Sequence, residues 1–208
     1  MPSGRYSVWG RSESVVGTED FRCAPGPAGW RYVSEIERDE PTSHRETVDV
    51  AVDAEWRIVR ARVETGSHEI VLEPDDDALR GVRDGERISI PWTVDMHLDY
   101  LSPAFNAITA RRLEDAPTDA AAREIEVVYL EPVSLEPTQM RQRYELVRRE
   151  HVDTPAGRFL ATRWTYTAVP TGWTSDLWVA DDVVVRYDRA FELISYERGA
   201  SGPVPVSP

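Results

Sequence analysis

The stretch RISIPWTVDMHLDYLSPAFNAITARRL, residues 87–113, holds both kinds of secondary structure that decide the fold. Over residues 87–100 apolar and polar side chains alternate, which is the period of a half-buried strand. Pro91 lies on the polar side and cannot donate a sheet hydrogen bond, so it predicts a bend or an edge position. We therefore expect one long strand, or two strands joined by a bulge.

The second half of this stretch predicts a helix. Ser102 is a favourable N-cap, Pro103 suits a first helical turn, and Ala104 to Leu113 contains no helix breaker. A helix on the surface would show one apolar stripe, whereas this one is apolar on most sides. We expect it to be buried and to emerge at Arg111-Arg112.

The rest of the chain predicts further strands separated by turns rich in glycine, proline and aspartate. The expected strands are Trp30 to Val33, Val48 to Val52, Glu55 to Val63, Glu69 to Leu72, Ile125 to Leu130, Arg141 to Val147, Phe159 to Ala168, Ser175 to Ala180, Val183 to Tyr187 and Phe191 to Tyr196. The apolar parity switches between residues 56–58 and 59–63, which predicts a bulge. Asp75-Asp76-Asp77 and Asp181-Asp182 are interpreted as turns. The fold class is mainly β, an antiparallel meander with one helix.

Residues 1–198 are predicted to form a single domain. Residues 199–208, with their small side chains and prolines, are predicted to be a flexible tail. The polar, alanine-rich link from Leu113 to Ala122 is expected to be mobile.

Charge and composition exclude several classes of function. The chain has 208 residues, with 37 acidic against 24 basic side chains and a formal charge of −13. Nucleic acids and anionic membranes would repel such a protein unless its basic groups were clustered, so no nucleic-acid partner is expected. A single cysteine, Cys23, fits a reducing compartment and a buried apolar role. Neither a signal peptide nor a membrane span is apparent, which predicts a cytoplasmic protein.

The order of these segments resembles the glycolipid-binding family that was formerly classed as a domain of unknown function. The most specific part is the strand that runs into Ser102-Pro103-Ala104-Phe105-Asn106 and then Arg111-Arg112-Leu113. The residues that carry the rest of the resemblance are Val8-Trp9, Gly29-Trp30-Arg31, Val50 to Val63 with its Asp53-Ala54-Glu55-Trp56-Arg57 core, Val94 to Tyr100, and Gln142-Arg143-Tyr144. The resemblance implies a spiral β-roll, in which a many-stranded antiparallel sheet wraps around a single buried α-helix. It also implies a homodimer and a glycolipid-like ligand.

Seven residues are predicted to bind such a ligand. The apolar part would contact Trp56, Trp92, Tyr100 and Phe105, and the polar part Asn106, Arg111 and Arg112. Aromatic faces stack on sugar rings and pack against acyl chains, although tryptophans also simply fill cores. A buried amide or guanidinium must find a partner. The alternative is that Asn106 bonds to a strand, and that the arginines cap carbonyls or pair with Asp95 or Asp99.

Asp95, His97 and Asp99 project from one face of the expected strand and could hold a divalent metal. The simpler interpretation is an ordinary polar strand face, so no metal site and no cofactor is predicted. Nucleophile elbows, phosphate loops and dinucleotide fingerprints are absent from the sequence, and no catalytic residue is assigned.

The leading hypothesis is non-enzymatic binding of an amphipathic small molecule. The alternatives are a structural protein whose helix fills the roll and whose sheet edges dimerise, and a hydrolase assisted by a metal at Asp95, His97 and Asp99.

Overall fold

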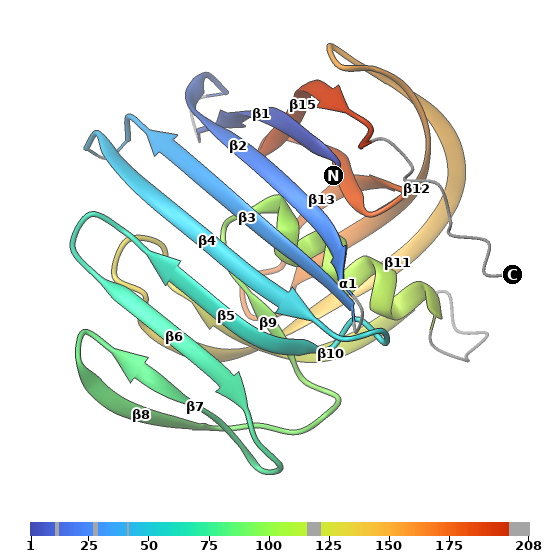
Figure 1. The fold of residues 1–208 in the computed structure, drawn as a ribbon. Helices are drawn as coiled ribbons and strands as arrows, with labels where there is room; N and C mark the ends of the chain where they lie inside the picture. The colour runs from blue at the N-terminus through green and yellow to red at the C-terminus, as the bar shows by residue number, and fades with distance from the viewer. Residues whose placement is uncertain (11–12, 27–28, 41, 116–121, 200–208) are drawn as a thin grey trace, which may run out of the picture.

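The structure is a computed structural model and describes residues 1–10, 13–26, 29–40, 42–115 and 122–199. Its strands join into one sheet of 15 strands with a single helix packed against it (Figure 1). The elements are β1 (Ser3–Trp9), β2 (Val15–Gly26), β3 (Gly29–Arg38), β4 (His44–Val52), β5 (Ile58–Glu64), β6 (Glu69–Pro74), β7 (Ala78–Arg83), β8 (Glu86–Pro91), β9 (His97–Asp99), α1 (Pro103–Asp115), β10 (Ala122–Leu130), β11 (Pro137–Thr154), β12 (Gly157–Ala168), β13 (Trp173–Ala180), β14 (Val183–Tyr187) and β15 (Phe191–Glu197).

Strands that follow one another in the chain are neighbours in the sheet, except for β8 and β9 at its two edges, and the first strand of the chain, β1, also pairs with the last, β15. The sheet runs from β8 back to β1, then across to β15 and down to β9. Val8 of β1 pairs with Phe191 of β15, so the first and last strands are antiparallel neighbours. β9 and β10 are parallel, because the chain passes through α1 between them. The fold is therefore the spiral roll that the resemblance implied.

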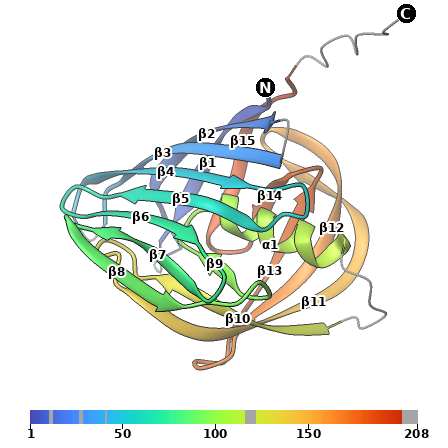
Figure 2. The same ribbon diagram turned by 60° about the horizontal axis from the view of Figure 1, so that its bottom comes forward.

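The helix α1 lies inside the curve of the sheet, between the half formed by β2 to β8 and the half formed by β10 to β14 (Figure 2). Phe105 and Ala110 are fully buried, and Leu113 near the end of the helix is 5% exposed. Inward-facing residues from both halves join α1 in one core. The prediction of a buried helix is confirmed, and it extends two residues further, to Asp115.

Two local predictions about the strands are also confirmed. β8 ends at Pro91 and lies at one edge of the sheet, where a missing amide donor costs no ladder bond. The register between β4 and β5 shifts so that Val52 pairs with Ile58 and Ala51 with Arg60. This leaves Val59 unpaired, and the bulge explains the change of apolar parity.

Two predicted strands are wrong in part. Residues 87–100 do not form a continuous strand, because residues 92–96 form a turn in which the amide of Met96 donates to the carbonyl of Thr93. Residues 55–57 form a turn and not a strand. There the carboxylate of Asp53 accepts the amides of Glu55 and Arg57, at 3.0 and 2.9 Å.

Three strands were not predicted: β1, β2 and β7. In β2 the alternation is hidden because Glu19 occupies an inward position beside Phe21 and Cys23, where an apolar residue is expected. Within the predicted link, Leu113 belongs to α1 and Ala122 begins β10, while residues 116–121 lie outside the described residues. Residues 200–208 of the predicted tail lie outside them too.

Candidate ligand-binding site

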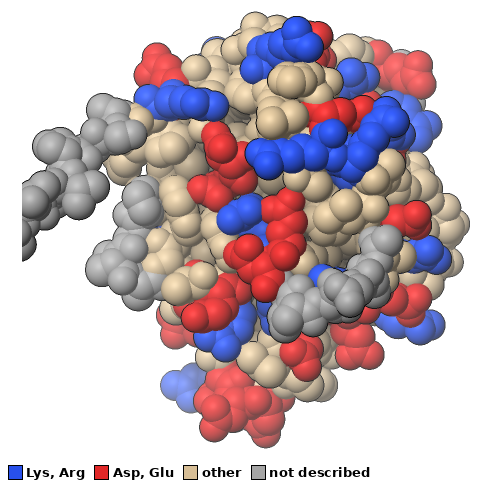
Figure 3. Space-filling model, turned by 90° about the vertical axis from the view of Figure 1, so that its right-hand side faces the viewer, with Lys and Arg blue, Asp and Glu red and all other residues tan. Residues whose placement is uncertain are grey.

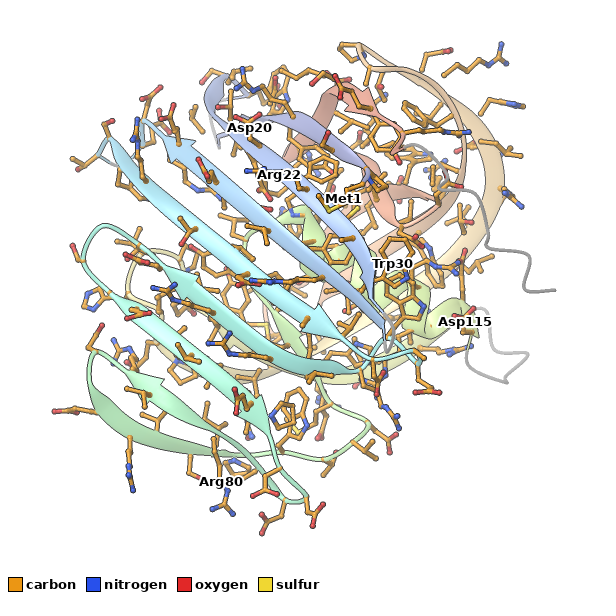
Figure 4. All side chains as sticks on the ribbon, viewed as in Figure 1. Met1, Asp20, Arg22, Trp30, Arg80 and Asp115 are labelled. Carbon is orange, nitrogen blue, oxygen red and sulfur yellow. The ribbon has the colours of Figure 1, made fainter. Side chains whose placement is uncertain are left out.

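Four residues meet at the end of the roll where α1 stops, and we call this group the aromatic end: Trp30, Trp56, Arg111 and Asp182. Trp30 stacks on Trp56 with ring centroids 5.9 Å apart and planes at 15°. The guanidinium of Arg111 lies over the Trp56 ring, 5.4 Å from its centroid. Figure 4 labels Trp30 in β3 and Asp115, the last residue of α1, whose carboxylate lies 4.0 Å from the guanidinium of Arg111. Trp56 is 5% exposed, with Trp30 and Arg111 packed on it, so the part of this group that is open to a sugar ring is the half-buried Trp30 and the 28% exposed side chain of Arg111.

Local backbone geometry places the two tryptophans. Trp56 has a φ of +61°, a value that the Asp53 turn imposes on it. β3 begins at Gly29, with a φ of +144°, and a Cβ there would lie 1.8 Å from the carbonyl oxygen of Val52. Only glycine allows this close approach, and it brings Trp30 beside the turn that carries Trp56.

Arg111 also contacts acidic groups. It donates to Glu114 at 2.7 Å, and its Nε lies 3.4 Å from the Oδ1 of Asp182 in the turn between β13 and β14. Burial raises the pKa of Asp182 and the charge of Arg111 lowers it, with burial the stronger effect. The hydroxyl of Tyr32 donates to the backbone carbonyl of Asp182 at 2.7 Å. The turn is thus held by one side chain from α1 and one from β3.

Arg112 has a different role from its neighbour. It donates to the carbonyl of Met96 at 2.8 Å and also to the carbonyl of Val94. Burial lowers its pKa, although a guanidinium remains charged. Arg112 thus caps the turn between β8 and β9, and the alternative that an arginine caps carbonyls is realised here.

Four predicted ligand residues are buried in the interior. Phe105 packs edge-to-face against Tyr100, with centroids 6.2 Å apart. The amide of Asn106 donates to the hydroxyl of Tyr144 on β11 at 3.1 Å. Trp92, also from the predicted set, is 6% exposed in the turn that Arg112 caps. The structure therefore brings Trp56 and Arg111 together and separates them from Tyr100, Phe105 and Asn106.

The opposite end of the roll holds a buried polar cluster that we call the closed end: Arg38, Glu46 and Tyr100, with Ser102 and Glu19 beside them. Arg38 pairs with Glu46 at 3.0 Å, and Tyr100 donates to the other Glu46 oxygen at 2.6 Å. Arg38 also donates to the carbonyl of Leu101 at 2.7 Å. These bonds fix the start of α1 to the sheet.

Glu19 fixes the first residue of the helix motif. The hydroxyl of Ser102 donates to its Oε1 at 2.6 Å, while its Oε2 is buried without a hydrogen-bond partner. Burial raises the pKa of this carboxyl to about 7. Sequence analysis missed Glu19, although an acidic residue at an inward strand position was a usable signal.

The metal hypothesis receives no support from the positions of its residues. Asp95 is exposed and precedes β9, whereas His97 and Asp99 are buried. His97 bonds to Thr109 at 3.2 Å and Asp99 accepts from Gln142 at 2.6 Å. Among the described residues, no three histidine, cysteine or carboxylate side chains are grouped where they could hold a metal ion.

Two hollows meet near the aromatic end. An outer pocket of about 170 Å³ is lined by Pro2, Cys23, Asp181, Asp182, Val183, Tyr196, Arg198 and Gly199. An inner cavity of about 10 Å³ lies along α1 and is lined by Tyr6, Glu19, Phe21, Tyr32, Ser34, Pro103, Ala104, Ala107, Asp182, Val183 and Val184. None of the seven predicted ligand residues lines either hollow, although Arg111 contacts Asp182, which lines both.

The fold and this site define a class of protein: a helix-filled antiparallel roll with aromatic and charged groups at one end. The sequence profile of a family described as "Putative glycolipid-binding" matches residues 7–191, and the chain belongs to this family. The family description supports a binding function in general terms. No helix within the described part of the chain is long and apolar enough to cross a membrane.

Solved structures of two other proteins share the fold. A DUF1089 family protein from Pseudomonas aeruginosa is 22% identical, with a TM-score of 0.60 over 84% of this chain and 91% of that one. A protein of the family DUF1849 from Brucella abortus is 8% identical, with a TM-score of 0.51 over 94% of this chain and 96% of that one. No curated protein sequence matches the chain.

Proposed function

We propose that the protein binds an amphipathic, glycolipid-like molecule without transforming it, and that the polar head lies at the aromatic end. The observation that carries this proposal is the stack of Trp30 on Trp56 with Arg111 above it. Indole faces pack against the apolar face of a sugar ring, and a guanidinium donates to its hydroxyl oxygens.

The five other residues of the predicted set have supporting roles in this proposal. Asn106 and Arg112 already donate to protein groups, and binding a ligand there would first break those bonds. Trp92, Tyr100 and Phe105 are buried, and they hold α1 and its neighbouring turns in place. Membership of the family, whose description gives a binding function in general terms, supports the proposal that the protein binds a ligand.

Native mass spectrometry of gently purified protein, followed by organic extraction and lipid analysis, tests the proposal first. A discrete bound mass that solvent releases would support it and would identify the ligand class. A dimer without bound mass, unchanged after incubation with alkyl glycosides, would favour the structural alternative, in which sheet edges associate.

A matched pair of variants then tests the location. Trp30→Leu should weaken binding of n-octyl glucoside about tenfold in titration calorimetry, because the half-buried indole that stacks on Trp56 supplies an aromatic contact of about 1.5 kcal/mol. Trp173→Leu is the control, since Trp173 is 43% exposed and starts β13 rather than lying at the aromatic end. Equal losses in both variants would contradict the assignment.

A further inference from the structure

The outer pocket and the inner cavity are neighbours, and residues of one turn separate them. Asp182 and Val183 line both hollows and follow Asp181 at the turn between β13 and β14. Asp181 has a φ of +51°, typical of a tight turn. If this turn moved outward, the two hollows would become one channel from the surface to the helix.

The walls of the inner cavity suit an alkyl chain along most of their length. On one side are the aromatic rings of Tyr6, Phe21 and Tyr32, and on the other is α1, which presents the small side chains of Pro103, Ala104 and Ala107. Its present volume of about 10 Å³ admits one water molecule at most, so a chain enters only when the turn and the helix separate.

The far end of the same cavity is polar and incompletely satisfied. Glu19 and Ser34 line it and are 0% and 1% exposed. Glu19 Oε2 and Ser34 Oγ have no hydrogen bond of ordinary geometry, although the Ser34 hydroxyl is close enough to lower the pKa of the Glu19 carboxyl. Buried polar atoms without a good partner are costly, and a water molecule, an ion or a ligand group that reaches them lowers that cost. A terminal polar group on the chain, or a water molecule ahead of it, would satisfy both.

Weak contacts hold the turn closed. Tyr32 donates one hydrogen bond to the Asp182 carbonyl, and Arg111 Nε lies 3.4 Å from the Asp182 carboxylate without a hydrogen-bond partner of its own. The side chains of Arg111 and Asp182 are 28% and 21% exposed, so solvent screens part of their attraction. Arg198 adds an exposed ion pair to Asp181 at 3.6 Å, and Val183, which pairs with Ala180 and is 3% exposed, would have to move with the turn. The polar contacts of the turn are nevertheless more exposed than those of the closed end, and therefore weaker.

Charge at the outer pocket selects the head group. Asp181 and Asp182 line it together with Arg198, which lies 3.6 Å from Asp181. Figure 3 shows acidic side chains near the centre of the face that forms the right-hand side of Figure 1. Carboxylates accept hydrogen bonds from sugar hydroxyls, whereas they repel a phosphate or a carboxylate head.

We propose that the Asp181–Asp182 turn is a gate, and that a single-chain amphiphile with an uncharged sugar head passes it to place its alkyl chain in the inner cavity. This inference rests on the proposed function and adds the route and the ligand class. Arg111 joins the two parts, because it contacts Trp56 on one side and Asp182 on the other.

Cys23 provides a built-in reporter of the gate. It is the only cysteine of the chain, it lines the outer pocket, and it is 1% exposed. Burial raises the pKa of its thiol to about 12, so reaction with a disulfide reagent is slow while the turn is closed. The rate of modification by 5,5′-dithiobis(2-nitrobenzoic acid) therefore measures opening.

The experiment compares variants and ligands on the full chain. Tyr32→Phe and Arg111→Gln should each speed modification of Cys23 about fivefold to tenfold, since each removes one contact of the gate. Arg186→Gln is the control, because Arg186 on β14 lies over Trp178 on β13, 5.3 Å from its ring centroid, and lines neither hollow. Unchanged rates in both gate variants, with the fold verified by circular dichroism, would overturn the gate.

Ligand protection tests the route and the head group. n-Octyl glucoside below its micelle concentration should slow the reaction of Cys23, and n-octyl phosphate should not. If calorimetry detects binding of the glucoside and Cys23 is not protected, the route is wrong and the proposed function stands. Equal protection by the phosphate would overturn the preference for an uncharged head. If neither compound binds, the proposed function falls together with this inference.

Discussion

At the closed end, a guanidinium, a carboxylate and a phenol are buried together, and each has a partner from another segment. At the aromatic end, Arg111 and Asp182 are partly exposed and 3.4 Å apart, next to two hollows. Buried charges are costly to separate, and exposed ones are not. The difference indicates that buried charged groups fix the start of α1, whereas partly exposed ones hold the Arg111 side of its last turn, and we place the ligand on that side.

The largest expected effect is at the closed end. Arg38→Met removes the permanently charged partner of the buried Glu46, which keeps only His44 at 2.8 Å and Tyr100 at 2.6 Å, and should lower the free energy of unfolding by about 3 kcal/mol. Urea unfolding at constant pH measures this loss. Adding Glu46→Leu to the same chain should restore part of it, because the unpaired carboxylate is then gone. A loss below about 1 kcal/mol would show that the closed end is no firmer than a surface ion pair.

The pH dependence of stability comes next. Burial raises the pKa of Glu19 from 4.5 to about 7. The folded state holds this proton more tightly than the unfolded state. Protonated Glu19 therefore contributes fully to the free energy of unfolding below pH 4.5, and this contribution is lost as the pH rises through 7. Glu19→Gln removes this pH dependence. The free energy of unfolding of the variant minus that of the parent should therefore be about 3 kcal/mol larger at pH 8 than at pH 4.5.

Other buried groups titrate in the same range, and the comparison of variant with parent cancels them. Burial raises the pKa of Asp99 to about 6, which acts in the same direction as Glu19, and lowers the pKa of His97 to about 3, which favours stability at higher pH. Urea titrations of both proteins between pH 4.5 and 8 give the difference directly. A difference that stays constant with pH would contradict the assignment to Glu19.

Neighbouring arginines give a smaller, matched comparison. Arg112→Gln removes charged hydrogen bonds to two carbonyls and should cost about 1.5 to 3 kcal/mol. Arg111→Gln removes partly exposed ion pairs and should cost less than about 1 kcal/mol. Thermal and urea unfolding test the order. The reverse order would mean that the aromatic end is the firmer one.

The smallest effect sharpens the division between core and site. Tyr144→Phe leaves the Asn106 amide without its acceptor and should cost about 1 kcal/mol of stability. It should leave the affinity for n-octyl glucoside unchanged within a factor of two, as calorimetry would show. A clear loss of affinity would return Asn106 to the ligand site.

Sequence patterns predicted the mainly β fold and the buried helix because both depend on short-range periodicity. The switch in apolar–polar alternation between Ile58 and Val63 indicated the bulge, and Ser102-Pro103 indicated the start of α1. β2 was hidden because Glu19 faces inward, a position that makes sense only with Ser102, 83 residues later.

The candidate site was predictable in part for the same reason. Trp56 and Arg111 were selected for their chemistry, and the structure brings them together. The sequence also placed their partners in elements of secondary structure: Trp30 at the start of a strand and Asp182 in a turn. The sequence pattern could not predict that these four residues lie together, because segments distant in the chain become neighbours only when the roll closes.

The pairing of β1 with β15 also has a consequence for biosynthesis. Val8 finds its partner Phe191 only after roughly 180 further residues have left the ribosome. Until then β1 is paired only with β2. The inward, apolar face of the first strands also remains exposed, because the strands on the other side of α1 have not yet been made. We expect the nascent chain to depend on holding chaperones for longer than a helical protein of equal length, and to complete its fold only after release.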